Sequence, residues 1–178
     1  SSSMSMSAIQ DMETAAITFI NNMLARDEGE ILKFANGVEV SQIFSGDLSQ
    51  LALAVQTFPN LSPSGTALYD VIDKALDDTS PRFGRRAVVV MTDGQDNISG
   101  LTADDIIAKA VYRGVPVFTI GLGSSINSDV LYKIASQTGG IYHESSDSSG
   151  LAAIYESISH MLRNQYIIEY DTNQPAYQ

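Results

Sequence analysis

The sequence contains no cysteine and no tryptophan, and basic residues are scarce. The absence of cysteine excludes disulfides, thiolate metal sites and cysteine nucleophiles, and it leaves the cellular compartment open. Ten Lys and Arg residues stand against 21 Asp and Glu residues, which gives a formal net charge of −11. Nucleic acids and anionic membranes both reward clustered basic residues, so neither is expected as a partner.

Long apolar runs are also missing. No stretch approaches the roughly 18–20 apolar residues that cross a bilayer, so we expect no direct membrane insertion. No basic segment followed by an apolar segment opens the sequence, as it would in a signal peptide. The composition is otherwise that of a globular protein, with 44% hydrophobic residues in a chain of 178. We predict a single domain over residues 1–171 and a tail or linker over residues 172–178.

Strand and helix patterns alternate regularly in the second half of the chain. Apolar runs typical of strands cover 87–92, 115–120, 141–143 and 165–170, and amphipathic patterns typical of helices cover 102–112, 128–137 and 150–162. This alternation predicts an α/β fold: a doubly wound, mostly parallel, Rossmann-like sheet with helices on both faces. The near-continuous apolar run at 88–91 predicts a strand that is buried on both faces.

The first half predicts a helix, a hairpin and two further helices. The helix covers 8–25, the hairpin pairs 30–34 with 38–44 around Asn36-Gly37, and the later helices cover about 47–55 and 66–76. One feature is irregular, because no strand precedes the helix at 8–25. A doubly wound fold normally begins with a strand that becomes central in the sheet.

Polar residues stand where a ligand site is expected. The strand at 87–92 ends at Asp93, and open α/β sheets bind ligands at the carboxyl ends of their strands. The segments Ser1-Ser2-Ser3 and Ser64-Gly65-Thr66 each precede a helix and could reach the same edge. Carboxylate and hydroxyl oxygens suit a hard cation of the Mg²⁺ type. Simpler alternatives are a turn aspartate before Gly94, a helix N-cap at Thr66 and a frayed end at the serines.

Five segments carry a resemblance to a known family. They are 13–20 (ETAAITFI), 64–70 (SGTALYD), 84–97 (GRRAVVVMTDGQDN), 138–140 (TGG) and 162–170 (LRNQYIIEY). In this order, over nearly the whole chain, the sequence resembles a von Willebrand factor type A (VWA) domain, in particular its bacterial branch. The resemblance implies the VWA fold, whose first strand is missing here.

The resemblance also implies a metal-ion-dependent adhesion site (MIDAS). The family builds this site from an Asp-x-Ser-x-Ser segment, a threonine and an aspartate. Carried over by motif, Thr66 is the threonine, Asp93 is the aspartate, and Ser1 and Ser3 are the two serines, with the leading aspartate upstream of residue 1. A second register makes Ser3 and Ser5 the serines and puts Ser1 in the place of the aspartate. The implied cofactor is Mg²⁺, or Mn²⁺ or Ca²⁺ in its place.

The implied function is protein binding rather than catalysis. The cation keeps an open position that a Glu or Asp of a partner protein fills, and the implied location is extracytoplasmic: secreted, at the cell surface or periplasmic. A second hypothesis is a metal-free structural or assembly domain whose missing strand comes from another segment or chain. A third is a Mg²⁺-dependent phosphohydrolase, for which Asp93 is the one candidate nucleophile or base.

Other acidic residues near these motifs have simpler interpretations. Asp96 and Asn97 either shape the ligand face or belong to a plain loop, and the loop is the preferred interpretation. Asp70, Asp73 and Asp77 recur at near-helical spacing, which predicts a solvated helix face.

Overall fold

The structure is a computed structural model that describes residues 6–57, 60–62, 64–145 and 150–163. It contains the helices α1 (Met6–Asn21), α2 (Leu48–Gln56), α3 (Leu68–Thr79), α4 (Ala103–Arg113), α5 (Ser128–Thr138) and α6 (Leu151–Arg163). The strands are β1 (Gly29–Phe34), β2 (Val38–Ser45), β3 (Val88–Thr92), β4 (Val117–Leu122) and β5 (Tyr142–Ser145). The predicted strand at 165–170 and the predicted tail at 172–178 lie outside the described residues.

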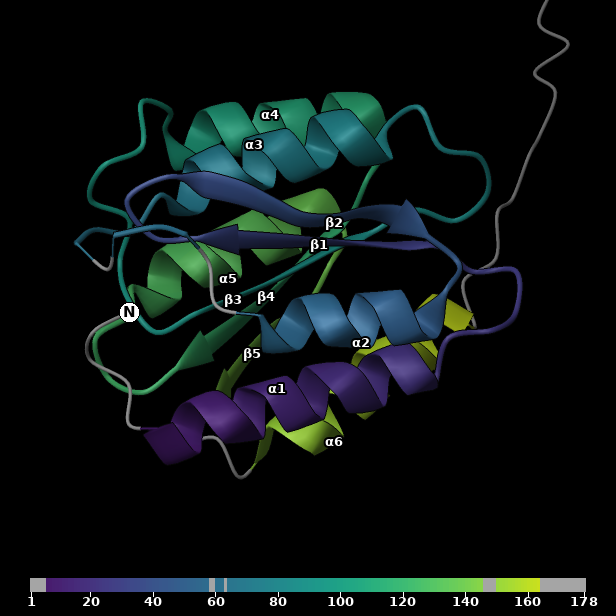
Figure 1. The fold of residues 1–178 in the computed structure, drawn as a ribbon. Helices are drawn as coiled ribbons and strands as arrows, with labels where there is room; N and C mark the ends of the chain where they lie inside the picture. Colours follow the sequence, from purple (N-terminus) through teal and green to yellow (C-terminus); the bar gives the residue numbers. More distant parts are fainter. Residues whose placement is uncertain (1–5, 58–59, 63, 146–149, 164–178) are drawn as a thin grey trace, which may run out of the picture.

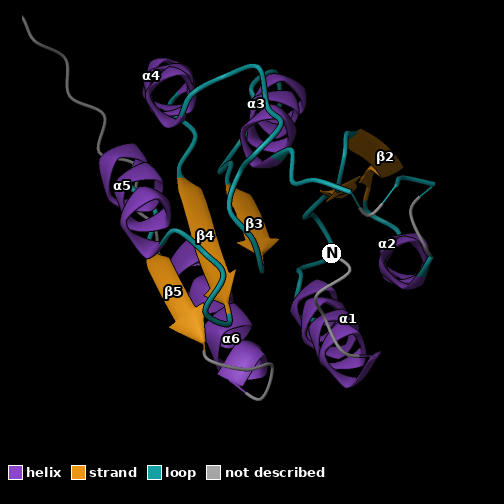
Figure 2. Ribbon diagram, turned by 90° about the vertical axis from the view of Figure 1, so that its left-hand side faces the viewer, coloured by secondary structure: helices purple, strands orange, loops and turns teal. Residues whose placement is uncertain are grey.

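Strands β3, β4 and β5 form a parallel sheet with β4 in the middle (Figure 2). The register pairs Val88 with Val117 in β3 and β4, and Thr119 with Tyr142 in β4 and β5. Helices α3, α4 and α5 pack on one face, and α1 and α6 cover the other (Figure 1). This arrangement confirms the predicted α/β class. No helix in the described part of the chain is long and apolar enough to span a membrane.

Local signals explain where the helices begin and end. Asp47 accepts hydrogen bonds from the first backbone N–H groups of α2, and Thr102 with Asp105 forms a capping box at the start of α4. Gly114 and Gly139 end α4 and α5 in the left-handed conformation, which glycine adopts without steric cost. The predicted boundaries of these helices are therefore correct to within a few residues.

Strands β1 and β2 form an antiparallel hairpin that makes a second, separate sheet. The hairpin forms around Asn36-Gly37 as predicted, but Phe34 pairs with Val38, so the loop has three residues, Ala35 to Gly37, and the predicted two-residue turn is wrong. Neither Asn36 nor Gly37 adopts the positive φ that such a turn needs. Within the loop, Ala35 N donates to Gly37 O at 3.0 Å. Within the described residues, β1 pairs with β2 and β3 pairs with β4, and no ladder joins β1 to β3. The sheet is therefore interrupted between the hairpin and β3 (Figure 2).

Both strands that border this interruption run in the same direction. Just after β1, Ala35 O accepts a hydrogen bond from Ala67 N at 2.8 Å. Beyond the end of β3, Asn97 N donates to Thr66 O at 3.2 Å. The ends of β1 and β3 therefore meet the same segment, Thr66-Ala67. Helix α3, which follows this segment, contacts both β1 and β3 and so spans the interruption on one face.

Burial differs between the two central strands. All six residues of β4 are buried, but Val89 and Met91 in β3 are only partly buried. The prediction that 88–91 is buried on both faces is therefore wrong for one face of β3. The reason is that β3 is an edge strand within the described residues, so its Val89 and Met91 meet side chains of α1 and α6 without a neighbouring strand on the hairpin side.

Candidate metal site at the carboxyl edge of the sheet

The loop after β3 is held tightly at its start. Thr92 is buried, and its hydroxyl accepts a hydrogen bond from Gly94 N at 3.2 Å and donates one to Gly94 O at 2.9 Å. These two bonds turn the chain sharply at the end of the strand. They place Asp93, which is half-buried, at the carboxyl edge of the parallel sheet. The structure thus puts this aspartate at the sheet edge where the sequence predicted it.

Thr66 lies directly against the same loop. Its backbone N donates to Asn97 Oδ1 at 2.9 Å, and its carbonyl accepts from Asn97 N at 3.2 Å. A Cβ atom added at Gly94 would lie 3.2 Å from Thr66 Oγ1. The hydroxyl of Thr66 therefore lies beside the residue that follows Asp93, and a larger residue than glycine would press on it.

The alternative role of Thr66 as a helix N-cap is wrong. The N-cap of α3 is Ala67, which offers no side-chain hydrogen bond. The first N–H groups of α3 are instead satisfied from the loop after β3. Tyr69 N donates to Asp96 Oδ1 and to Ser99 Oγ at 3.2 Å each, and Ser99 Oγ itself donates to Asp96 at 2.5 Å.

Asp96 and Asn97 therefore do more than form a plain loop. Together with Ser99, they join the loop after β3 to the segment that carries Thr66 and begins α3. Sequence reasoning gave Asp96 and Asn97 no such role and missed Ser99 altogether. The bonds connect residues about thirty positions apart, so no local sequence pattern announces them. The nearest available signal is the run of short polar residues after the strand, which is typical of side chains that bond to nearby backbone.

Gly65 completes the arrangement. Its φ of +116° lies in a region that side-chain-bearing residues rarely adopt, and an added Cβ would lie 3.1 Å from Ile98 Cδ1. The backbone before Thr66 can therefore approach the loop after β3 only because residue 65 is glycine.

A small pocket adjoins this edge between the starts of α3 and α5. It has a volume of about 40 Å³, and its lining includes Tyr69, Gly94, Asp96 and Asn127. A space of this size holds a water molecule or two and no organic ligand. Burial, and then the charge of Asp96, raise the pKa of the Tyr69 hydroxyl, which therefore stays protonated. The edge suits a small ion with its waters better than a metabolite.

The donor atoms at the edge are hard oxygen ligands. The Thr66 hydroxyl and the Asp93 carboxylate match the preference of Mg²⁺, Mn²⁺ and Ca²⁺. Among the described residues, however, no group of three or more His, Cys, Asp or Glu side chains could hold a metal. Ser1, Ser3 and Ser5, the remaining predicted ligands, lie outside the described residues. The described part of the chain thus fits the cation in type and supplies only part of its coordination shell.

The prediction of a solvated face for the aspartates of α3 needs correction. Asp73 and Asp77 both bind Lys109 of α4, at 2.5 and 2.8 Å, and Asp77 lies 3.5 Å from Arg113. These ion pairs fasten α3 to α4. Asp73 and Asp77 therefore stabilise the packing of α3 against α4.

Comparison with known protein families identifies the family of this chain. The model of the von Willebrand factor type A domain matches residues 1–157. The chain belongs to the von Willebrand factor type A domain family. This VWA domain is 23% identical over 191 residues to inter-alpha-trypsin inhibitor heavy chain H3 of Rattus norvegicus. The aligned region covers 97% of this chain and 22% of the relative. The chain thus spans about a fifth of the length of that relative.

Solved structures share the fold of this VWA domain. BatB from Bacteroides thetaiotaomicron has a TM-score of 0.73 at 20% identity, over 88% of this chain and 89% of that one. A von Willebrand factor type A protein from Catenulispora acidiphila has a TM-score of 0.75 at 17% identity, over 89% of this chain and 39% of that one. Proximal thread matrix protein 1 from the mussel byssus, solved with a zinc-occupied MIDAS motif, has a TM-score of 0.73 at 19% identity. That match covers 85% of this chain and 40% of the mussel protein. At these identities the likeness shows the fold alone, and it confirms the expected architecture. VWA domains are generally adhesion or protein-interaction modules rather than enzymes.

Proposed function

We propose that this VWA domain binds a partner protein through a divalent cation at the carboxyl edge of its sheet. Thr66 and Asp93 would hold the cation, and Ser1 and Ser3 would complete the protein ligands. The observation that carries the proposal is the position of the Thr66 hydroxyl against Gly94, next to Asp93 at the end of β3. The zinc-occupied MIDAS of the mussel protein supports it by fold analogy.

The chemistry of such a site explains how an acidic protein could bind an acidic ligand. Two carboxylate-rich surfaces repel each other, and this chain carries a net charge of −11. A cation with one open position would accept a Glu or Asp carboxylate from the partner and join the two surfaces. Mg²⁺ prefers six oxygens at about 2.0–2.1 Å and retains several waters, so Thr66, Asp93 and two serines leave room for the partner's oxygen. We also propose an extracytoplasmic location for this interaction.

Calorimetric titration tests the cation site. Mg²⁺ and, separately, Mn²⁺ are titrated into the chain and into the variants Asp93→Ala and Glu156→Ala. Glu156 is exposed on α6, which packs on the other face of the sheet, and so provides a loss of one carboxylate outside the loops that carry Thr66 and Asp93. We expect saturable binding that is lost in Asp93→Ala and kept in Glu156→Ala. Equal binding by both variants, or no binding by the unsubstituted chain, would contradict the proposal.

A second function has its own supporting observation, which is the interrupted sheet. β1 and β3 run in the same direction, α3 spans both, and no ladder joins them in the described part of the chain. We propose, as the alternative, an assembly domain in which another segment or chain supplies a strand between β1 and β3. Strand addition gives affinity through main-chain hydrogen bonds on both edges and specificity through alternate side chains.

A designed extension tests strand addition. The segment Val-Ile-Val-Val-Val-Asp is joined before residue 1, and the control has its second and fourth residues replaced by proline, which cannot complete a central ladder. If the strand is accepted, the melting temperature rises by about 4 °C or more over the control. Equal melting temperatures for the two extended chains would contradict strand addition and leave the cation proposal standing.

A further inference from the structure

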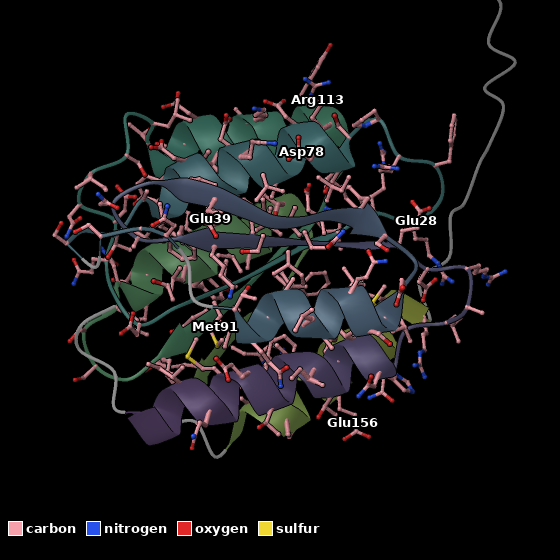
Figure 3. The ribbon with its side chains drawn as sticks, in the orientation of Figure 1. Glu28, Glu39, Asp78, Met91, Arg113 and Glu156 are labelled. Atoms are coloured by element: carbon pink, nitrogen blue, oxygen red, sulfur yellow. The ribbon has the colours of Figure 1, made fainter. Side chains whose placement is uncertain are left out.

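A groove between the β1–β2 hairpin and α3 shares no lining residue with the candidate metal site. It has a volume of about 560 Å³ and runs between the hairpin and the second half of α3. The hairpin contributes Glu30, Val40, Ile43 and Phe44, and the segment from α3 onward contributes Lys74, Asp78 and Arg82. Figure 3 labels Asp78 on α3 and Glu28 just before the start of β1.

The floor of the groove is apolar and exposed. Ile43 is 69% exposed and Val40 is 37% exposed, although both belong to β2. β2 is the outer strand of the hairpin, so no further strand covers this side in the described residues. Apolar side chains grouped in a concave surface with a charged rim are typical of a protein-binding site.

The rim of the groove contains two kinds of charged contact. Lys74 pairs with Asp78, and Arg82 lies 3.4 Å from Glu28 with its guanidinium 4.2 Å from the centre of the Phe44 ring. Glu30, by contrast, lies in the same groove as another carboxyl group, that of Asp78. Burial, and then the negative charge of Asp78, raise the pKa of Glu30. A positive charge placed between the two carboxyl groups would stabilise both in their ionised form.

We propose that this groove binds a partner-protein segment in which a large aliphatic side chain is adjacent to a lysine or arginine. The aliphatic side chain would cover Val40 and Ile43, and the cation would lie between Glu30 and Asp78. Arg82 already places one cation in the same groove, where its guanidinium lies over Phe44 and 3.4 Å from Glu28. The net charge of −11 favours a basic partner segment through long-range attraction.

Binding of this kind releases protons. Burial is the main cause that raises the pKa of Glu30 to about 7, and the charge of Asp78 raises it further. Near pH 7, therefore, a substantial share of molecules carry a proton on Glu30 before the segment binds. The neighbouring cations Lys74 and Arg82 lower the pKa but do not outweigh burial. The groove requires no metal, so this proposal stands or falls independently of the cation site.

The probes for the test are three capped peptides: Ac-Gly-Ile-Lys-Ile-Gly-NH₂, the same peptide with Glu for Lys, and the same peptide with Ser for both Ile residues. They are titrated into ¹⁵N-labelled protein in EDTA, and amide shifts are followed by NMR. We expect the Ile-Lys-Ile peptide to shift the amides of Glu30, Ile43 and Phe44 in a saturable way. The two control peptides should bind at least about fivefold more weakly.

Matched variants separate docking from loss of folding. Ile43→Ser should weaken the Ile-Lys-Ile peptide at least about fivefold, whereas Val111→Ser, at a 58% exposed position on α4, should leave binding unchanged. Glu30→Gln should weaken binding similarly and abolish the proton release seen by calorimetry at pH 7 in buffers of different ionisation enthalpy. Equal binding of the Lys and Glu peptides, equal effects of Ile43→Ser and Val111→Ser, or no binding at millimolar peptide would overturn the proposal.

Discussion

At the scale of single residues, the candidate metal site depends on a side chain that is not one of the proposed ligands. Asp96 accepts hydrogen bonds from Tyr69 N and Ser99 Oγ. In this way it joins the start of α3 to the loop after β3. Thr66 immediately precedes this helix and Asp93 opens the loop, so Asp96 maintains the distance between the two proposed ligands.

Removal of this carboxylate should lower stability measurably. We expect Asp96→Ala to reduce the free energy of unfolding by about 1–2 kcal/mol, because the first turn of α3 loses one of its two side-chain acceptors and Ser99 Oγ loses its own acceptor. Urea denaturation followed by circular dichroism measures the change. Asp104→Ala is the control, since that carboxylate is 76% exposed and pairs with Lys133 at the surface. A loss of about 0.5 kcal/mol or less is expected there, and equal losses in the two variants would refute the role of Asp96.

Glu30 predicts a pH dependence of stability. Its pKa is raised from the ordinary 4.5 to about 7 in the folded protein, so folding favours the protonated form. This contribution is fully present below pH 4.5 and is lost as pH rises through about 7. Between pH 5 and pH 8 the unsubstituted chain should lose about 1 kcal/mol more stability than Glu30→Gln, a figure that allows for solvent screening. Urea denaturation at both pH values checks this, and parallel pH profiles would argue against a raised pKa.

The sequence located single residues well where a local pattern surrounds them. Thr66 and Asp93 lie at the same edge as predicted, because Asp93 follows an apolar strand and Thr66 precedes a helix. Asp96 and Ser99 were not predicted as connectors, since their partners Tyr69 and Asp70 are about thirty residues away. The ion pairs of Asp73 and Asp77 with Lys109 were missed for the same reason, because helical periodicity shows which residues share a face and not what packs against it.

At the scale of elements, the main departure from expectation is the difference between β3 and β4. Both have the apolar sequence of a strand buried on two faces, and only β4 is fully buried. Hydrophobic patterns report the environment of a strand in a complete sheet. They do not show that β3 has no hydrogen-bonded neighbour on its hairpin side in the described part of the chain.

Hydrogen exchange should reveal this difference. β4 pairs with β3 on one edge and with β5 on the other, so its amides at Phe118 and Ile120 should be among the most protected in the chain. The amides of β1 and β3 should exchange at least about tenfold faster, because each strand has one paired edge. NMR-detected exchange at neutral pH resolves these amides individually. Protection of β3 equal to that of β4 would contradict the interrupted sheet.

At the scale of the whole molecule, aspartates gather at the starts of three helices, although α3 also carries Asp77 and Asp78 in its last turn. Aspartates occupy the first turns of α3, α4 and α5, on the side of the candidate metal site: Asp70, Asp104, Asp105 and Asp129. Arginines bind backbone carbonyls at the opposite ends: Arg85 binds Arg163 O, and Arg86 binds Ser80 O and Arg113 O. This arrangement complements the helix dipoles. It also gives the carboxyl edge of the sheet a negative potential that favours cations.

The central claim is that a divalent cation binds between Thr66 and Asp93. Paramagnetic broadening by Mn²⁺ tests it most directly, because broadening depends steeply on distance from the ion. With substoichiometric Mn²⁺, we expect selective loss of the amide signals of Thr66, Gly94 and their neighbours, with the signal of Gly139 at the far end of α5 retained. Asp93→Ala should restore the lost signals. Broadening centred elsewhere, or the same broadening in Asp93→Ala, would contradict the claim.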